Sequence, residues 1–148
     1  MKQFWKLNAV SMLYALMIAI PVELMLNVYR ISRIADLEIG TVNSLTGIIL
    51  LFEVTLGTLL FYTLIQKWLG RKNSNYWTVI LWLPYFVLYL YGFATLFPIS
   101  YGGDMPNPGS GLLIIAGLFI YPFYILTLTS AALPIDYGKK DEADSLPN

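Results

Sequence analysis

Apolar residues fall in four long blocks along the chain, and short polar segments separate the blocks. The blocks cover residues 7–29, 45–66, 76–97 and 111–133. Each is close to the ~20 residues that an α-helix needs to cross the hydrocarbon core of a bilayer. None alternates with the period of two that strands of a membrane barrel require. The pattern predicts an all-α integral membrane protein, in which four transmembrane helices form a compact bundle joined by short loops.

Composition supports this class. Hydrophobic residues make up 57% of the chain and charged residues 12%, whereas a typical soluble domain has about 25% charged residues. Aromatic side chains also mark several block ends, as expected where amphipathic rings meet lipid headgroups; examples are Trp5, Tyr29, Trp68, Trp77 and Tyr101.

Lys and Arg set the expected orientation. Seven would lie on one side of the membrane, namely Lys2, Lys6, Lys67, Arg71, Lys72, Lys139 and Lys140, and two on the other, Arg30 and Arg33. The positive-inside rule then places both termini in the cytoplasm. We expect a multi-pass protein of a cell membrane, of the bacterial inner-membrane type, with the lipid bilayer as its surroundings.

The chain divides into one membrane domain, residues 1–133, and a short tail, residues 134–148. The tail is polar and charged, and we expect it to be disordered and cytoplasmic. The first apolar block is longer than the ~7–15 residues of a signal-peptide core, so we expect an uncleaved first span.

The chain has no cysteine and no histidine. This excludes thiol–disulfide exchange, Cys/His zinc sites and His-ligated haem. No phosphate-binding loop or dinucleotide fingerprint occurs, and the net charge of zero gives no reason to expect a nucleic-acid partner. We therefore expect no cofactor, no metal site and no catalytic residue, and the chain is not expected to be an enzyme.

Glu53 stands inside an apolar block, in the stretch GIILLFEVTLGTLLF. A charged side chain at the bilayer centre costs about 3 to more than 10 kcal/mol, depending on the method. Such a residue faces the bundle interior or a cavity, or it is protonated. Glu53 is therefore a candidate ion, proton or ligand site, or a hydrogen bond that locks two helices.

Glu23 is a second candidate near the outer end of the first block. Counted from the predicted block ends, Glu23 and Glu53 would lie at one depth, which makes the two carboxyls candidates to share a proton or a cation. Asn27 and Arg30 extend the face of Glu23 at i+4 and i+7. Arg30 is placed to neutralise Glu23 from the interface, in a structural or a binding role.

Trp82, Tyr85, Tyr89 and Gly92 share one face of the third block. Tyrosine hydroxyls within a membrane need hydrogen-bond partners, so Tyr85 and Tyr89 are candidates for a ligand wall. The alternative is that the face only packs against a neighbouring helix.

Two functions fit these features. The first is a non-catalytic accessory, regulatory or immunity-type subunit that binds a larger membrane partner through buried polar residues. The second is a small homo-oligomeric transporter or channel subunit, coupled to a cation or a proton, that uses Glu53 and Glu23.

Overall fold

The structure is a computed structural model that describes residues 2–70 and 72–133. Four long helices are present: α1 (Lys2–Leu26), α3 (Ile39–Leu64), α4 (Thr78–Leu96) and α5 (Pro108–Ala132). The shorter helix α2 (Val28–Ala35) follows α1. Three single turns complete the described chain: η1 (Ile65–Leu69), η2 (Asn73–Trp77) and η3 (Gly102–Asp104). The expected disordered tail lies outside the described residues.

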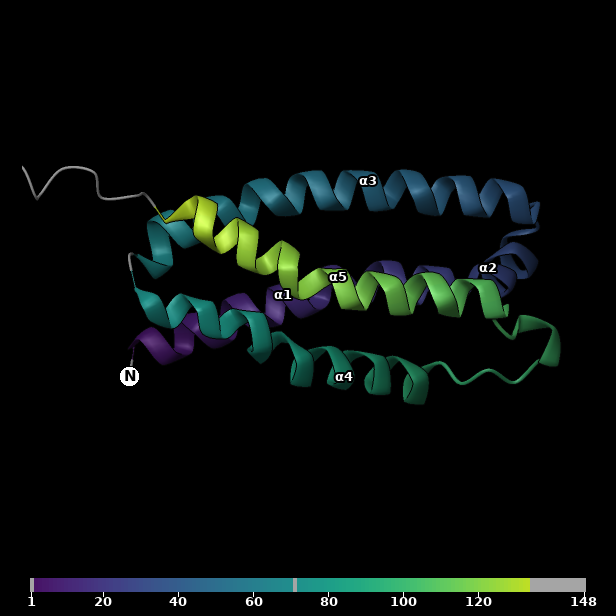
Figure 1. Ribbon diagram of the computed structural model, residues 1–148. Coiled ribbons are helices and arrows are strands. Elements are labelled where there is room, and N and C mark those ends of the chain that lie inside the picture. The colour runs from purple at the N-terminus through teal and green to yellow at the C-terminus, as the bar shows by residue number, and fades with distance from the viewer. Residues whose placement is uncertain (1, 71, 134–148) are drawn as a thin grey trace, which may run out of the picture.

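The four long helices run lengthwise in one bundle, with α2 at one end (Figure 1). Both ends of the described chain lie at the opposite end, as an even number of spans requires. All four long helices are long and apolar enough to cross a membrane. In this count α3 includes η1, and α4 includes η2. The expectation of an all-helical chain with four such helices is therefore confirmed. For brevity, the end that carries α2 is called the α2 end, and the other is called the terminal end.

The core forms around α1, which contributes more buried residues than any other described helix. Its buried side chains recur at helical spacing, for example Leu7, Val10, Tyr14 and Met17. Tyr14 stacks on Phe61 of α3 at 3.9 Å between ring centroids. The exposed residues of α1, such as Met12, Leu16 and Ile20, are apolar like the buried ones, so the helix shows no amphipathic pattern in the sequence.

Toward the terminal end, α1 and α4 pack extensively against each other. Trp82 of α4 is buried and lies edge-on to Tyr121 of α5 at 5.0 Å. The hydroxyl of Tyr85 donates a hydrogen bond to Asn8 Oδ1 at 2.6 Å, which joins α4 to α1. Hydrogen bonds between membrane helices contribute about 0.6–2 kcal/mol each.

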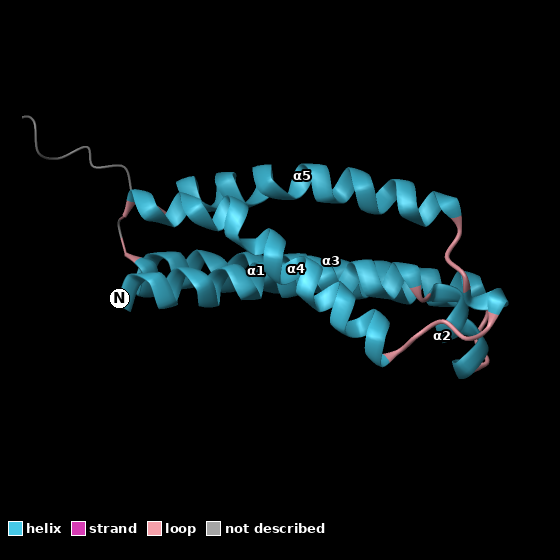
Figure 2. Cartoon of the chain, turned by 90° about the horizontal axis from the view of Figure 1, so that it is seen from below, coloured by secondary structure: helices cyan, strands magenta, loops and turns pink. Residues whose placement is uncertain are grey.

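The helices α1 and α4 separate toward the α2 end. Figure 2 shows α4 leaving the direction of α1 as it approaches its C-terminus, and Figure 1 shows the same divergence. Pro84 lies in the first half of α4. Proline cannot donate the helical hydrogen bond to the carbonyl four residues earlier and bends a helix. The sequence thus contains a local cause for the opening between α1 and α4.

Polar contacts fix the terminal end, where α3 continues into η1, a π-helical turn. Lys6 donates a hydrogen bond to the carbonyl of Trp68 at 2.7 Å, and Gln3 donates to that of Leu69 at 3.4 Å. The fully buried side chain of Asn75 accepts from Gln3 and donates to the carbonyl of Gly70. These side chains satisfy carbonyls that the end of a helix leaves without a partner.

α3 is the least embedded part of the bundle along its middle. Its only buried residues, among the fully described positions of this helix, are Val42, Thr46 and Phe61. Between Thr46 and Phe61 the close approach to α1 occurs at Gly57. A Cβ atom there would lie 2.8 Å from the sulfur of Met17.

The observed bounds differ from the predicted blocks mainly near the α2 end. The first helix ends at Leu26, because Asn27 forms a turn and the chain re-enters a helix as α2. α3 begins at Ile39, six residues before the predicted start. α2 was not predicted, because eight residues with several polar side chains carry no membrane-span signal.

We predict that Gly57→Leu lowers the stability of the bundle by about 1–3 kcal/mol, because the new side chain must displace Met17 from the α1–α3 contact. Gly47→Leu, on the same helix, is the control, since a Cβ at Gly47 meets no atom within 4 Å. Thermal unfolding in detergent measures both. Equal melting temperatures for the two variants would show that α3 does not pack at Gly57.

Candidate functional site

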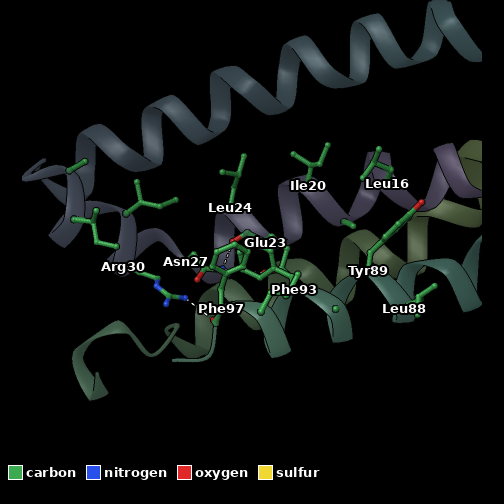
Figure 3. Close-up of a pocket in the computed structure, with 16 residues that line it drawn as sticks. Leu16, Ile20, Glu23, Leu24, Asn27, Arg30, Leu88, Tyr89, Phe93 and Phe97 are labelled. Carbon is green, nitrogen blue, oxygen red and sulfur yellow. Dashed lines mark hydrogen bonds between the residues drawn. The ribbon is translucent and has the colours of Figure 1, made fainter. Parts of the chain in front are cut away.

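A groove opens between α1, α2 and α4 where α1 and α4 diverge, with a volume of about 830 Å³ (Figure 3). Its walls are mostly apolar. The apolar lining residues are Leu16, Ala19, Ile20, Leu24, Ile31, Ile34, Ala35, Leu88, Gly92, Phe93, Leu96 and Phe97. The polar lining residues are Glu23, Asn27, Arg30 and Tyr89. The volume is within the ~300–1,000 Å³ of most small-molecule sites.

Glu23 and Asn27 form a pair in this groove. Asn27 Nδ2 donates to Glu23 Oε2 at 3.2 Å and to the carbonyl of Glu23 at 2.9 Å. Asn27 stands at the turn between α1 and α2, so one side chain holds both the turn and the carboxylate. Glu23 makes no salt bridge with any described residue.

The sequence predicts that Arg30 neutralises Glu23. In the structure Arg30 instead donates hydrogen bonds to the end of α4. Its Nη1 donates to the carbonyl of Phe97 at 2.9 Å and its Nη2 to that of Pro98 at 3.1 Å. Helix ends leave carbonyls without intrahelical donors, and a guanidinium group satisfies two of them at once. Arg30 thereby connects α2 to the end of α4 and forms the edge of the groove at the α2 end.

The second arginine of α2, Arg33, holds the loop that connects α4 to α5. Its Nε and Nη2 donate to the two carboxylate oxygens of Asp104 at 2.9 and 2.7 Å. Asp104 is 2% exposed, and the guanidinium of Arg33 also lies 5.2 Å from the ring centroid of Tyr101. Hydrogen bonding from Arg33 holds the pKa of Asp104 below its usual range. This bidentate pair is the strongest polar contact at the α2 end.

Glu53 does not line the groove. It lies in the middle of α3, between Thr46 and Phe61, where no residue of this helix is buried. Its side chain is half-buried. The oxygen Oε2 is shielded from solvent and has no hydrogen-bond partner among the described residues. A buried polar atom without a partner costs about 1–3 kcal/mol, and more when it is charged.

Hydroxyl groups gather in the bundle core between α1, α3 and α5. Tyr121 donates to the carbonyl of Tyr14 at 2.6 Å, and the hydroxyls of Thr58 and Tyr124 bond to each other at 2.8 Å. Three further hydroxyl oxygens, those of Ser11, Tyr14 and Thr129, are buried and make no hydrogen bond of standard geometry with a described residue, although the hydroxyls of Tyr14 and Thr129 lie near each other. Groups of this kind commonly bind internal water.

The structure divides the residues singled out in the sequence into separate places. Glu23, Asn27, Arg30 and Tyr89 come together around the groove. Tyr85 instead binds Asn8, in the closed part of the bundle. The predicted face of the third block therefore has two roles. Tyr85 packs against α1, and Tyr89 and Gly92 line the groove.

Glu23 and Glu53 do not share a site in the structure. From the stacked pair Tyr14 and Phe61, Glu23 is nine residues along α1 and Glu53 eight residues along α3 toward the α2 end, about 13.5 and 12 Å. No hydrogen bond joins the two carboxyls, and only Glu23 lines the groove. The two carboxyls therefore lie at a similar depth, as the sequence predicts, but they face different parts of the bundle.

The groove carries few polar groups. It has one carboxylate, one amide, one guanidinium and one phenol along otherwise apolar walls. In residues 2–70 and 72–133, no three acidic side chains gather in a way that would hold a metal ion.

Sequence reasoning missed the Arg33–Asp104 pair and the Tyr85–Asn8 pair. Both join residues more than 70 positions apart, so no local spacing signals them. A partial signal exists for Asp104, since it is the one acidic residue in a Gly- and Pro-rich loop and lies opposite the two arginines of α2.

Comparison with known proteins does not assign the chain to a family: no family model, no curated protein and no solved structure matches it. The case for a function therefore depends on the residues described above.

We predict that the α4–α5 loop loosens at acidic pH. The pKa of Asp104 is lowered in the folded chain, so its contribution to stability is present above the ordinary aspartate pKa of ~3.9 and is lost as the pH falls through the lowered value. Hydrogen exchange of residues 98–107, corrected for intrinsic rates, should show this loss. In Asp104→Asn, protection of the loop should already be reduced at pH 7 and should respond little to acid.

Asp36→Asn is the matched control, because Asp36 is an exposed carboxylate at the end of α2. It should retain the wild-type response to pH. Wild-type protection in Asp104→Asn at pH 7 would show that the Arg33–Asp104 pair does not hold the loop.

Proposed function

We propose that the chain is a non-catalytic accessory subunit, of a regulatory or immunity type, that binds a larger membrane protein through α3. Glu53 is the polar anchor of this contact. The four long helices would cross a cell membrane, with both termini in the cytoplasm and the α2 end outside. The excess of Lys and Arg at the terminal end supports this orientation.

The unpartnered carboxyl oxygen of Glu53 is the observation that carries the proposal. In lipid, a polar group without a hydrogen-bond partner costs several kcal/mol. The described part of the chain supplies no partner, since the hydroxyl of Thr58, five residues along α3, bonds to Tyr124 instead. A side-chain donor from a second membrane helix at this depth would bind Oε1, the oxygen of this carboxyl that the described bundle does not shield, and would stabilise the group.

The surface around Glu53 suits such a helix. Phe52 and Leu56, its neighbours on α3, are 63% and 62% exposed. No residue between Thr46 and Phe61 is buried within the described bundle. Membrane helices associate through van der Waals packing together with interhelical hydrogen bonds, and this stretch offers both.

A homo-oligomeric transporter or channel coupled to a cation or a proton is the second candidate. The buried hydroxyls of Ser11, Tyr14 and Thr129, which make no hydrogen bond of standard geometry with a described residue, favour it because they would line a polar path through the core. The separation of Glu23 from Glu53 weighs against a shared coupling site. In this case Glu53→Gln would abolish flux, whereas in the accessory function it would only weaken an assembly.

We predict that Glu53→Leu separates the stability of the isolated chain from the binding of its partner. Replacing an unsatisfied carboxyl by an apolar side chain of similar size should leave the melting temperature in detergent unchanged or raise it. The amount of partner retained on purification from native membranes should fall by about tenfold, as expected for the loss of a charge-assisted hydrogen bond.

A photoreactive amino acid at Phe52 should crosslink to the partner, and one at Val87 serves as the control. Val87 is equally exposed at 61%, and α4 lies across the bundle from α3 (Figure 1). Marked destabilisation by Glu53→Leu would show instead that Glu53 is bonded within its own chain. Equal crosslinking from both positions would rule out α3 as the specific contact.

A further inference from the structure

We propose that the groove between α1, α2 and α4 binds one amphiphilic lipid whose headgroup carries both a phosphate and a primary amine. The headgroup would lie at Glu23, Asn27 and Arg30, and the acyl chains beside Leu16 and Leu88. This site is separate from the α3 surface, so it stands or falls independently of the accessory function.

The length of the groove indicates a ligand from a single leaflet. Its walls extend from Leu16 to Leu24 on α1 and from Leu88 to Leu96 on α4, about 12 Å each at 1.5 Å per residue, and α2 forms its end. Half of the ~30 Å hydrocarbon core of a bilayer is about 15 Å. A groove of this length matches the chains of one lipid that enters from the leaflet at the α2 end.

Beyond this length, α1 and α4 close on each other. Asn8 and Tyr85 are joined by a hydrogen bond there, and Trp82 fills the space between the helices. A transmembrane helix of a partner would need a recess over the whole ~30 Å thickness, and the terminal half of this face offers none. A lipid needs only the half that is open.

Polarity changes along the groove as it does along a lipid. The ionisable side chains Glu23 and Arg30 lie toward the α2 end, together with Asn27 (Figure 3). The opposite end of the groove, around Leu16 and Leu88, is lined by aliphatic side chains and by Tyr89, whose hydroxyl is the one polar group there among the lining residues. The charged end therefore lies at headgroup depth and the apolar end reaches toward the midplane.

The two charged side chains define the headgroup. Glu23 is bound by the neutral amide of Asn27 and by no cationic group among the described residues, so its carboxylate would accept hydrogen bonds from a primary ammonium. Arg30 uses one N–H of each Nη on backbone carbonyls, and a guanidinium has five N–H donors in all. The remaining donors of Arg30 would bind the phosphate. A quaternary ammonium cannot donate to Glu23, and a glycerol headgroup brings no positive charge.

The glycines of the chain provide a matched pair of variants for the test. A Cβ at Gly92, which lines the groove, meets no atom within 4 Å, and the same is true at Gly117 on α5, outside the groove. Gly92→Leu therefore fills the groove without disturbing the fold, and Gly117→Leu adds the same side chain elsewhere. Both changes improve helix propensity.

The experiment is native mass spectrometry of the purified, delipidated full-length chain, titrated with phosphatidylethanolamine, phosphatidylcholine or phosphatidylglycerol with identical acyl chains. We expect one phosphatidylethanolamine to bind at least tenfold more tightly than the other two lipids. Gly92→Leu should lose this lipid, and Gly117→Leu should bind it as the wild type does. Glu23→Gln should bind the three lipids with affinities within a few-fold of one another.

Equal binding of the three lipids by the wild type would overturn the headgroup assignment. Unchanged binding by Gly92→Leu would overturn the groove as the site. A photocrosslink from Leu88 to a protein rather than to lipid in native membranes would show that the groove receives a partner helix. A melting temperature measured for Glu23→Gln separates loss of binding from loss of folding, and the glycine pair does not depend on that variant.

Discussion

The packing of α1 against α4 is the contact on which the other features of this structure depend. It is tight toward the terminal end, where Trp82 is buried and Tyr85 bonds to Asn8. It is lost toward the α2 end, beyond Pro84, and the groove occupies the space that results. α2 then closes the end of this space by binding the end of α4 through Arg30. One helix pair thus explains both the rigid half of the bundle and the open half.

The polar residues of the bundle differ in how fully the chain satisfies them. Arg33 and Asp104 satisfy each other with two hydrogen bonds. Glu23 has a neutral partner, Asn27, and faces a groove. Glu53 has one oxygen with no partner in the described chain. Because unsatisfied polar groups are costly in an apolar surrounding, this order ranks the sites by how much each gains from an external partner. This ranking favours a structural role for the Arg33–Asp104 pair, a ligand for Glu23 and a protein contact for Glu53.

The sequence was sufficient for the fold class and for the four long helices, because blocks of about 20 apolar residues have few other solutions. It also identified the four polar residues that line the groove, namely Glu23, Asn27, Arg30 and Tyr89. It failed where geometry depends on helix ends. The turn at Asn27 shortened α1 and created α2, whose arginines bind the end of α4 and the loop that follows it.

Contacts between residues distant in sequence were also beyond reach. Arg30 was paired with Glu23 by helical spacing, but the carbonyls at the end of α4 are better placed to accept its hydrogen bonds. The buried hydroxyls of Ser11, Tyr14 and Thr129 carried no signal, because serine, tyrosine and threonine are common in membrane helices with no special role.

The central claim is that this chain works by binding another membrane protein, and the mass of the intact particle tests it most directly. The tagged chain would be extracted from native membranes in polymer discs that retain the surrounding lipid, and the particle would be weighed by native mass spectrometry. The account predicts the 16.8 kDa chain in fixed stoichiometry with one larger membrane protein. A particle whose protein mass is a whole multiple of 16.8 kDa would contradict it and favour the homo-oligomeric transporter.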